Sequence, residues 1–269
     1  MTEPIVDRVL RSARYRDVDR AMLDRLAAEE LPKARTVDDA VKRVKRRLHQ
    51  AVGAYRGARA TDVLAAVRTT WDGDFTDQVF RAACAEALRT HASTAERLPH
   101  LERFYAPIWT LTGGPPQRLL DLGCGLGPLA LPWMGLPRTA TYHAADVDRR
   151  SLEVAGEFLE LVGQPHALHA GDLVAESPPT VHADVALLLK LVPLLDRQDS
   201  SAATRVLRAL DARYAVITFP SRSLGGGGHR GMAATYRRRL DDLVAETGVS
   251  EVREASVPNE LLFVLTLHG

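Results

Sequence analysis

The stretch Asp121-Leu-Gly-Cys-Gly-Leu-Gly127 decides the fold of this chain. It continues the apolar run that begins at Arg118-Leu-Leu120 and leads directly into Pro128-Leu-Ala-Leu131, which is compatible with a helix. A buried strand, a tight glycine turn and the start of a helix place free backbone N–H groups and the positive end of the helix beside a ligand. Only glycine lets a ligand approach the backbone that closely. The stretch therefore predicts a ligand site at the end of this strand.

After this turn the sequence alternates between strand and helix patterns. Seven strands are predicted, the last two as a hairpin, at 118–122, 141–145, 167–170, 184–189, 214–219, 251–256 and 260–267. This alternation is typical of an open α/β sheet that binds its ligand at the carboxyl ends of its parallel strands. We therefore expect a Rossmann-like, mostly parallel seven-stranded sheet in the second part of the chain.

The first part of the chain carries helical patterns and no convincing strand. Asp17 is expected to cap one helix and Thr36 to cap another, which continues to about residue 54. The cluster Thr112-Gly-Gly-Pro-Pro116 is typical of a boundary between structural units. We therefore predict a helical N-terminal domain in residues 1–110 and an α/β domain in residues 111–269.

Basic residues are concentrated near the N-terminus. The whole chain has a formal net charge of +1 at pH 7, yet residues 1–60 hold 15 Lys and Arg against 9 Asp and Glu. One run lies on the helix that Thr36 begins: Lys42, Arg43, Lys45, Arg46 and Arg47. Such an arm indicates an anionic partner, most simply nucleic acid, whereas the alternative is a solvated helix surface. Charge alone leaves both interpretations open.

Other classes of protein are disfavoured by the sequence. The chain begins with charged residues and no apolar signal region, and its longest apolar run, 185–195, is interrupted by Lys190 and Pro193. Cys84 and Cys124 lie 40 positions apart and suggest neither a disulfide framework nor a metal site. We therefore expect a soluble cytoplasmic protein without a bound metal.

Acidic residues follow the second and third predicted strands. Asp146 lies 21 residues after Gly125, where an acid accepts hydrogen bonds from both hydroxyls of a ribose. Asp148 is the alternative, although it is better placed to cap the next helix. Asp172 is placed to accept from an adenine amino group, although aspartate is also common in turns. Together with the glycine turn, these residues resemble S-adenosylmethionine-dependent methyltransferases more than dinucleotide-binding proteins.

The segment 187–196, into which the fourth strand leads, indicates what receives the methyl group. It lacks the Asn/Asp-Pro-Pro-aromatic motif of exocyclic-amine methyltransferases. It also lacks the Pro-Cys pair of cytosine-C5 methyltransferases, since neither cysteine of the chain lies near it. The acceptor that remains is a nucleophile that needs no general base, such as guanine N7. For such an acceptor, alignment with the methyl group supplies most of the catalysis. Lys190 is then expected to bind guanine O6, and Asp196 to accept from N1–H or the exocyclic amine. The alternative for Lys190 is a side chain that snorkels at a strand end.

Several of these segments resemble one family. His91-Ala-Ser-Thr-Ala-Glu-Arg97, the glycine turn, Asp146-x-Asp and Leu187-Leu-Leu-Lys190 are similar to the aminoglycoside-resistance 16S rRNA methyltransferases, which methylate guanine 1405 at N7. The similarity extends from the helical N-terminus to Gly269. It implies a monomer whose helical domain docks on the 30S subunit and whose class I methyltransferase domain gives resistance to gentamicin- and kanamycin-type drugs.

The resemblance also implies roles for individual residues. S-adenosyl-L-methionine, and its product S-adenosyl-L-homocysteine, are expected to be bound by Tyr55, His91, Ser93, Thr94, Arg97, Gly123, Asp146, Asp172, Leu173, Leu188 and Gln198. Arg197 competes with Gln198 for the same role. From the residues alone, Arg97 either holds the cofactor's carboxylate or is a surface residue, and Thr94 is a helix cap.

The substrate side of the site is implied in the same way. Lys190 and Asp196 are expected to handle the guanine, which is extruded from its RNA helix into the pocket. RNA phosphates are expected to be contacted by Lys42, Arg43, Lys45, Arg46, Arg47, Arg230 and Arg237. Two alternatives remain: a methyltransferase for another RNA or a small molecule, and a non-catalytic ribosome-associated factor with this fold.

Overall fold

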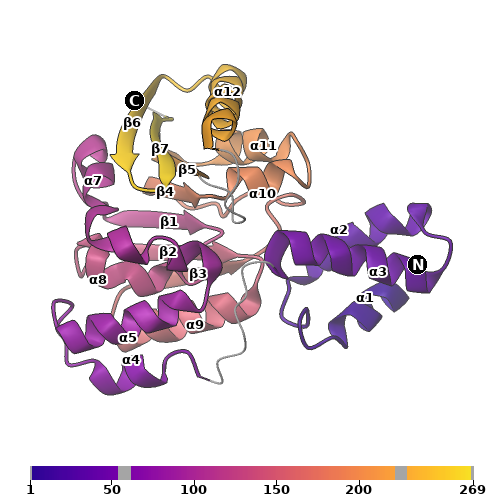
Figure 1. The fold of residues 1–269 in the computed structure, drawn as a ribbon, viewed down its shortest axis with the longest axis horizontal. Helices are drawn as coiled ribbons and strands as arrows, with labels where there is room; N and C mark the ends of the chain where they lie inside the picture. Colours follow the sequence, from indigo (N-terminus) through magenta and orange to yellow (C-terminus); the bar gives the residue numbers. More distant parts are fainter. Residues whose placement is uncertain (1, 54–61, 222–228, 268–269) are drawn as a thin grey trace.

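A seven-stranded sheet forms the centre of the protein (Figure 1). The computed structural model describes residues 2–53, 62–221 and 229–267. The strands are β1 (Arg118–Leu122), β2 (Thr141–Asp146), β3 (His166–Ala170), β4 (Ala183–Leu189), β5 (Ala212–Pro220), β6 (Glu251–Val257) and β7 (Glu260–Thr266). Their order is β3-β2-β1-β4-β5-β7-β6. Strands β1 to β5 are parallel and β7 is antiparallel to both neighbours, which confirms the predicted mostly parallel sheet and final hairpin.

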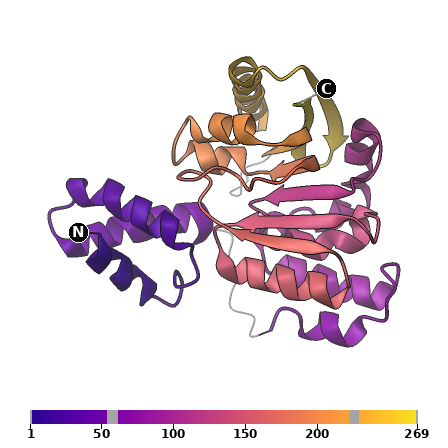
Figure 2. The same cartoon turned by 180° about the vertical axis from the view of Figure 1, so that it is seen from behind.

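Helices cover the sheet and also form a separate lobe (Figures 1 and 2). They are α1 (Glu3–Leu10), α2 (Arg20–Glu30), α3 (Val37–Leu48), α4 (Ala65–Thr70), α5 (Gln78–Arg89), α6 (Ala92–Ala95), α7 (Ala106–Thr112), α8 (Leu131–Met134), α9 (Arg149–Leu161), α10 (Val192–Asp196), α11 (Ala202–Ala209) and α12 (His229–Thr247). Helix α3 continues into a π-helical turn, His49–Gly53. None of the helices in the described ranges has the length and apolar character needed to cross a membrane.

Each face of the sheet has its own hydrophobic core. Helices α4, α5, α7 and α9 pack on one face, where Leu119 of β1 and Tyr142 of β2 are buried. Helices α10, α11 and α12 pack on the other face, where Leu120 of β1 and Leu188 of β4 are buried. Because successive strand residues point to opposite faces, the apolar run of β1 serves both cores.

The lobe formed by α1, α2 and α3 buries a third core around Leu23, Leu26 and Val44. Phe80 of α5 and Ile108 of α7 belong instead to a core of the sheet. The packing therefore divides the segment 1–110 that the sequence assigns to one helical domain, because its later helices cover the sheet. An amphipathic helix fits either partner equally well, so its pattern does not reveal which core it joins.

Side-chain caps begin two helices of the lobe, α2 and α3. Thr36 caps α3 as predicted, accepting the N–H of Asp39 at 3.1 Å. The cap of α2 is Asp19 and not the predicted Asp17, since the Asp19 carboxylate accepts a backbone N–H two residues later at 2.9 Å. The carbonyl oxygen of Asp17 instead accepts the N–H of Arg149 at 2.9 Å. Asp17 thus joins the lobe to the sheet.

The lobe lies at the carboxyl ends of the parallel strands (Figure 1). The N–H of Asp19 donates to the carbonyl oxygen of Val147 at 2.8 Å, and the guanidinium of Arg149 donates to the Asp19 carboxylate at 2.8 Å. Val147 and Arg149 directly follow β2. The lobe is therefore attached at the edge where open α/β sheets bind their ligands.

Candidate functional site

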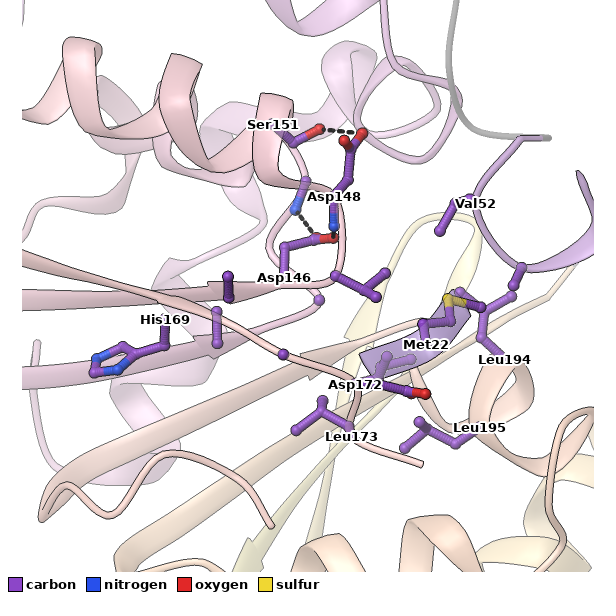
Figure 3. Close-up of a pocket in the computed structure, with 18 of the residues that line it drawn as sticks. Met22, Val52, Asp146, Asp148, Ser151, His169, Asp172, Leu173, Leu194 and Leu195 are labelled. Atoms are coloured by element: carbon purple, nitrogen blue, oxygen red, sulfur yellow. Dashed lines mark hydrogen bonds between the residues drawn. The ribbon is translucent and has the colours of Figure 1, made fainter. Parts of the chain in front are cut away.

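A cavity of about 450 Å³ lies between the ends of the strands and the lobe (Figure 3). Its wall includes the glycine turn, the segments after β2, β3 and β4, and Met22, Ala51 and Val52 from the lobe. This volume is within the range of roughly 300–1,000 Å³ that is usual for small-molecule sites. Ala51 and Val52 were not predicted as wall residues. The residue of this segment that was predicted to bind the cofactor is Tyr55, which lies outside the described residues.

The glycine turn brings the backbone close to the cavity. Gly123 and Gly125 both adopt left-handed conformations, with φ of +65° and +50°. A Cβ atom on Gly123 would lie 2.9 Å from Cδ1 of Leu191, and one on Gly125 would lie 3.1 Å from the ring of His91. The shape of the turn therefore requires glycine at both positions.

Asp146 ends β2 at the wall of the cavity (Figure 3). Its carboxylate accepts the N–H of Gly125 at 2.8 Å and the N–H of Asp148 at 2.8 Å. Burial raises the pKa of Asp146 to about 6, although these backbone N–H groups oppose the shift. Asp148 caps α9 as expected, accepting from the N–H of Arg150 and the hydroxyl of Ser151. Both acids line the cavity, and Asp146 is the one of the two that does not cap the following helix.

Asp172, Leu173 and Gln198 form another part of the wall. Arg25 of α2 links two of them, donating to the Asp172 carboxylate at 2.6 Å and to the Gln198 amide oxygen at 2.7 Å. Arg25 was not predicted from the sequence, because nothing in its neighbourhood distinguishes it from a solvated arginine on a helix. Arg197, the competitor of Gln198, is not among the described residues of the wall.

Lys190 lies in the wall on the side of β4 and has a left-handed φ of +59°, which is unusual for a residue with a side chain. Its N–H donates to Thr218 of β5, to the side-chain oxygen at 3.0 Å and the carbonyl oxygen at 3.2 Å. The Lys190 ammonium group contacts the carboxylate of Glu96 and lies 3.3 Å from that of Glu260. The lysine is thus held in place at both its backbone and its charged end.

Glu260 is a buried acid that sequence reasoning missed. It begins β7, and its carboxylate accepts two hydrogen bonds from Arg97, at 2.7 and 3.1 Å. The signal for Glu260 in the sequence is its position directly before the apolar run Leu261-Leu-Phe-Val-Leu265. Burial opposes the ionisation of Glu260, but the charges of Arg97 and Lys190 hold its pKa below the ordinary value.

The predicted cofactor residues fall into two groups. Among those that the structure describes, the residues in the cavity wall are His91, Ser93, Gly123, Asp146, Asp172, Leu173 and Gln198. Arg97 is bound to Glu260 instead, Thr94 donates from its hydroxyl to the carbonyl oxygen of Leu88, and Leu188 is buried in a core of the sheet. The second group therefore stands behind the wall in this structure.

Asp196, predicted to handle the guanine, is held by an arginine of another helix. The guanidinium of Arg239 in α12 donates to both carboxylate oxygens of Asp196, at 2.8 and 2.9 Å. Asp196 is not among the described residues of the cavity wall, whereas Leu194 and Leu195 beside it are. Its position is thus set by the packing of α12 against α10 and α11.

Three of the basic residues predicted on α3 have no ion pair within the described part of the chain: Lys42, Lys45 and Arg46. Arg43 pairs with Asp39 on its own helix, and Arg47 pairs with Glu29 and Glu30 of α2 at 3.0 and 2.9 Å. Arg47 therefore stabilises the lobe.

The other predicted phosphate contacts lie on α12. Arg237 forms a two-bond pair with Glu254 of β6, at 2.7 and 2.6 Å. The side chain of Arg230 lies outside the described residues. Over the same described ranges, no group of three or more His, Cys, Asp and Glu side chains is placed to hold a metal ion.

An open, mostly parallel sheet with a glycine turn after β1 and acids after β2 and β3 defines the class I methyltransferase fold, as predicted. The family model described as "Ribosomal RNA methyltransferase (FmrO)" matches residues 11–264. This chain belongs to that family.

Relatives and solved structures agree with this assignment. The chain is 40% identical to a 16S rRNA (guanine(1405)-N(7))-methyltransferase of Frankia casuarinae, over 98% of this chain and 94% of the relative. It is 36% identical to the protein of the same name from Micromonospora echinospora, over 96% and 93%. The structure of the 16S rRNA methyltransferase RmtF in complex with S-adenosyl-L-homocysteine is similar, with a TM-score of 0.84, 32% identity, and coverage of 98% and 97%.

Proposed function

We propose that this protein transfers a methyl group from S-adenosyl-L-methionine to N7 of guanine 1405 in the 16S rRNA of the assembled 30S subunit. The observation that carries this proposal is full-length similarity to enzymes of that name, combined with a cavity of the expected composition. The methylated guanine carries a positive charge where a cationic aminoglycoside binds, so modification gives resistance. The protein acts as a monomer in the cytoplasm, where its substrate is found.

The cavity fits an adenosine-containing cofactor. Asp146 accepts hydrogen bonds from ribose hydroxyls, and Asp172 accepts from the adenine amino group. The backbone at Gly123 and Gly125 leaves room that a Cβ atom would fill. When bound, the cofactor supplies a methyl group on a positively charged sulfur, which is a strong electrophile.

Lys190 supports the transfer from the side of the base. Guanine N7 has a free lone pair at neutral pH, so no residue has to remove a proton before attack, and the enzyme's main task is alignment. The Lys190 ammonium group donates to guanine O6 and so orients the base with N7 toward the methyl group. Glu96 and Glu260 hold this ammonium group at the cavity wall, and Thr218 holds its backbone.

Docking on the ribosomal subunit involves the lobe. Lys42, Lys45 and Arg46 project from α3, whose π-helical continuation supplies Ala51 and Val52 to the cavity wall. Contacts of these basic residues with RNA phosphates position the enzyme without reading base sequence. The same helix thus leads from the docking surface to the cofactor cavity.

Labelled cofactor tests this proposal directly. Purified 30S subunits are incubated with the protein and S-adenosyl-L-methionine labelled in its methyl group, and the modified position is mapped by mass spectrometry and primer extension. We expect label on N7 of guanine 1405 alone. Label on another nucleotide or a small molecule favours the alternative methyltransferase activity. Cofactor binding without any transfer to subunits contradicts the proposal.

A further inference from the structure

Arg25, on helix α2 of the lobe, bridges two residues of the cavity wall. Its Nε donates to Oδ2 of Asp172 at 2.6 Å, and its Nη2 donates to Oε1 of Gln198 at 2.7 Å. Its Nη1 donates to Glu29 at 3.0 Å, so each nitrogen of the guanidinium is engaged. Asp172 follows β3 and Gln198 follows α10, so this arginine connects two segments that come from different parts of the fold.

The bridge is shielded from water. The side chain of Arg25 is 12% exposed and that of Asp172 is 4% exposed. The other oxygen of Asp172 accepts the N–H of Val174 at 3.0 Å, so both carboxylate oxygens have a fixed donor. A charged hydrogen bond between buried groups is strong and directional, and it fixes the orientation of the carboxylate.

Arg25 acts from behind the wall. Met22, one helical turn before Arg25, lines the cavity. Arg25 is not among the described residues that line it. At its start, the same helix is fixed to the segment after Asp146 through Asp19 and Val147. Helix α2 is therefore fixed to the segment after Asp146 near its start and to Asp172 through Arg25.

We propose that Arg25 is a positioning residue that makes the cavity selective for adenine, an inference that rests on the proposed function. It orients Asp172 so that a carboxylate oxygen faces the 6-amino group of the base. It also engages the carbonyl oxygen of Gln198, whose amide nitrogen donates to the carbonyl oxygen of Leu194 at 3.4 Å and has a second hydrogen for a ring nitrogen of the base. A base with oxygen at position 6 presents an acceptor to this fixed carboxylate and is rejected.

The selectivity depends on the lobe. Because Arg25 belongs to α2, the adenine end of the cavity is complete only when the lobe is seated against β3 and α10.

The test compares S-adenosylhomocysteine with its deaminated analogue, S-inosylhomocysteine. Calorimetry on the full chain gives the Kd of both compounds for the wild type, Arg25→Ala, Arg25→Lys and Arg20→Ala. Arg20 is a control on the same helix because it pairs with Asp24 and is 49% exposed. We expect the wild type and Arg20→Ala to prefer the adenine compound by roughly tenfold or more.

In Arg25→Ala we expect S-adenosylhomocysteine to bind about tenfold more weakly, the scale of a missing charged hydrogen bond, and the preference to nearly disappear. Arg25→Lys retains the positive charge but lacks the several donors of the guanidinium group, so we expect it to keep part of the preference for the adenine compound. The inference is overturned if the ratio of the two Kd values in Arg25→Ala equals the wild-type ratio. If the alanine variant does not fold, the same comparison is made with Arg25→Lys. Equal weakening for both compounds also overturns it, since that marks a purely structural role. A wild-type protein that binds neither compound contradicts the proposed function itself.

Discussion

Arg97 and Glu260 form a two-bond ion pair although 163 positions separate them in the chain. Their side chains are only 8% and 1% exposed. The Arg97 guanidinium also lies over the ring of Phe104, 4.9 Å from its centre. Because Glu260 lies beside Lys190 as well, this pair connects the segment before α7, the final hairpin and the candidate catalytic lysine.

Replacement of Arg97 is expected to destabilise the protein. Arg97→Ala leaves the buried Glu260 without its two-bond partner, and removal of one partner of a buried ion pair lowers the free energy of unfolding by about 3–5 kcal/mol. Urea unfolding without cofactor, followed by tryptophan fluorescence, measures this change. Arg103→Ala, at an exposed position in a neighbouring turn, is the control. A decrease of less than about 1 kcal/mol would show that the pair behaves as a surface ion pair.

Replacement of Lys190 is expected to separate catalysis from cofactor binding. Lys190→Gln removes the ammonium group that orients the base, and because misplacement of a reacting group by about 1 Å costs about 10²-fold, methylation of 30S subunits should fall by roughly 10²-fold. The affinity for S-adenosylhomocysteine should change little, because Asp146 and Asp172 remain in place. Single-turnover rates and calorimetry provide the two measurements, with Lys33→Gln on the lobe as control. Methylation at the wild-type rate would exclude Lys190 from the reaction.

Cofactor affinity is expected to fall in mild acid. Burial raises the pKa of Asp146 to about 6, and in the proposed site the ionised form accepts from the ribose hydroxyls. Protonation therefore removes the binding form, and the affinity should weaken by about tenfold for each pH unit below that pKa. Calorimetry with S-adenosylhomocysteine between about pH 5 and pH 8 covers the window. Asp146→Asn should bind weakly at every pH in this range. A constant wild-type affinity down to the acid limit would contradict the assigned role of Asp146.

Charge reversal on α3 is expected to weaken binding to the ribosomal subunit. Lys42→Glu with Arg46→Glu should raise the Kd for 30S subunits. The dependence of that Kd on salt should also fall, by about one power of the salt concentration for each RNA phosphate that the variant no longer neutralises. Cofactor affinity should not change. Arg89→Glu with Arg103→Glu makes the same change of charge on helical segments that cover the sheet. Equal weakening in both double variants would point to net charge and not to a docking surface.

Strands and the acids that follow them were predictable because their signals are local. Each parallel strand is a short apolar run, and the strand order brings Asp146 and Asp172, which end or follow two of these runs, to one edge. The hairpin strands and the helix cap at Thr36 follow from equally local patterns. These features depend on residues that are close together in the sequence, so the sequence alone reveals them.

Long-range pairs could not be predicted in the same way. Arg25, Arg97 and Arg239 all lie on segments that suit a solvated arginine, yet each binds an acid far away in the chain. Their partners are set by the packing of whole helices against the sheet, which depends on tertiary geometry. The same reason explains why α4, α5 and α7 join the sheet and not the lobe.

The independent core of α1 to α3 has a consequence for engineering. In the proposed function the lobe addresses the RNA and the sheet carries the chemistry, and because the lobe has its own core it is open to exchange. A chimera with a different RNA-binding module would redirect methylation to another helix of RNA. Such a graft would need to reproduce the anchors that Asp19 and Arg25 provide, because the lobe supplies part of the cavity wall and holds Asp172.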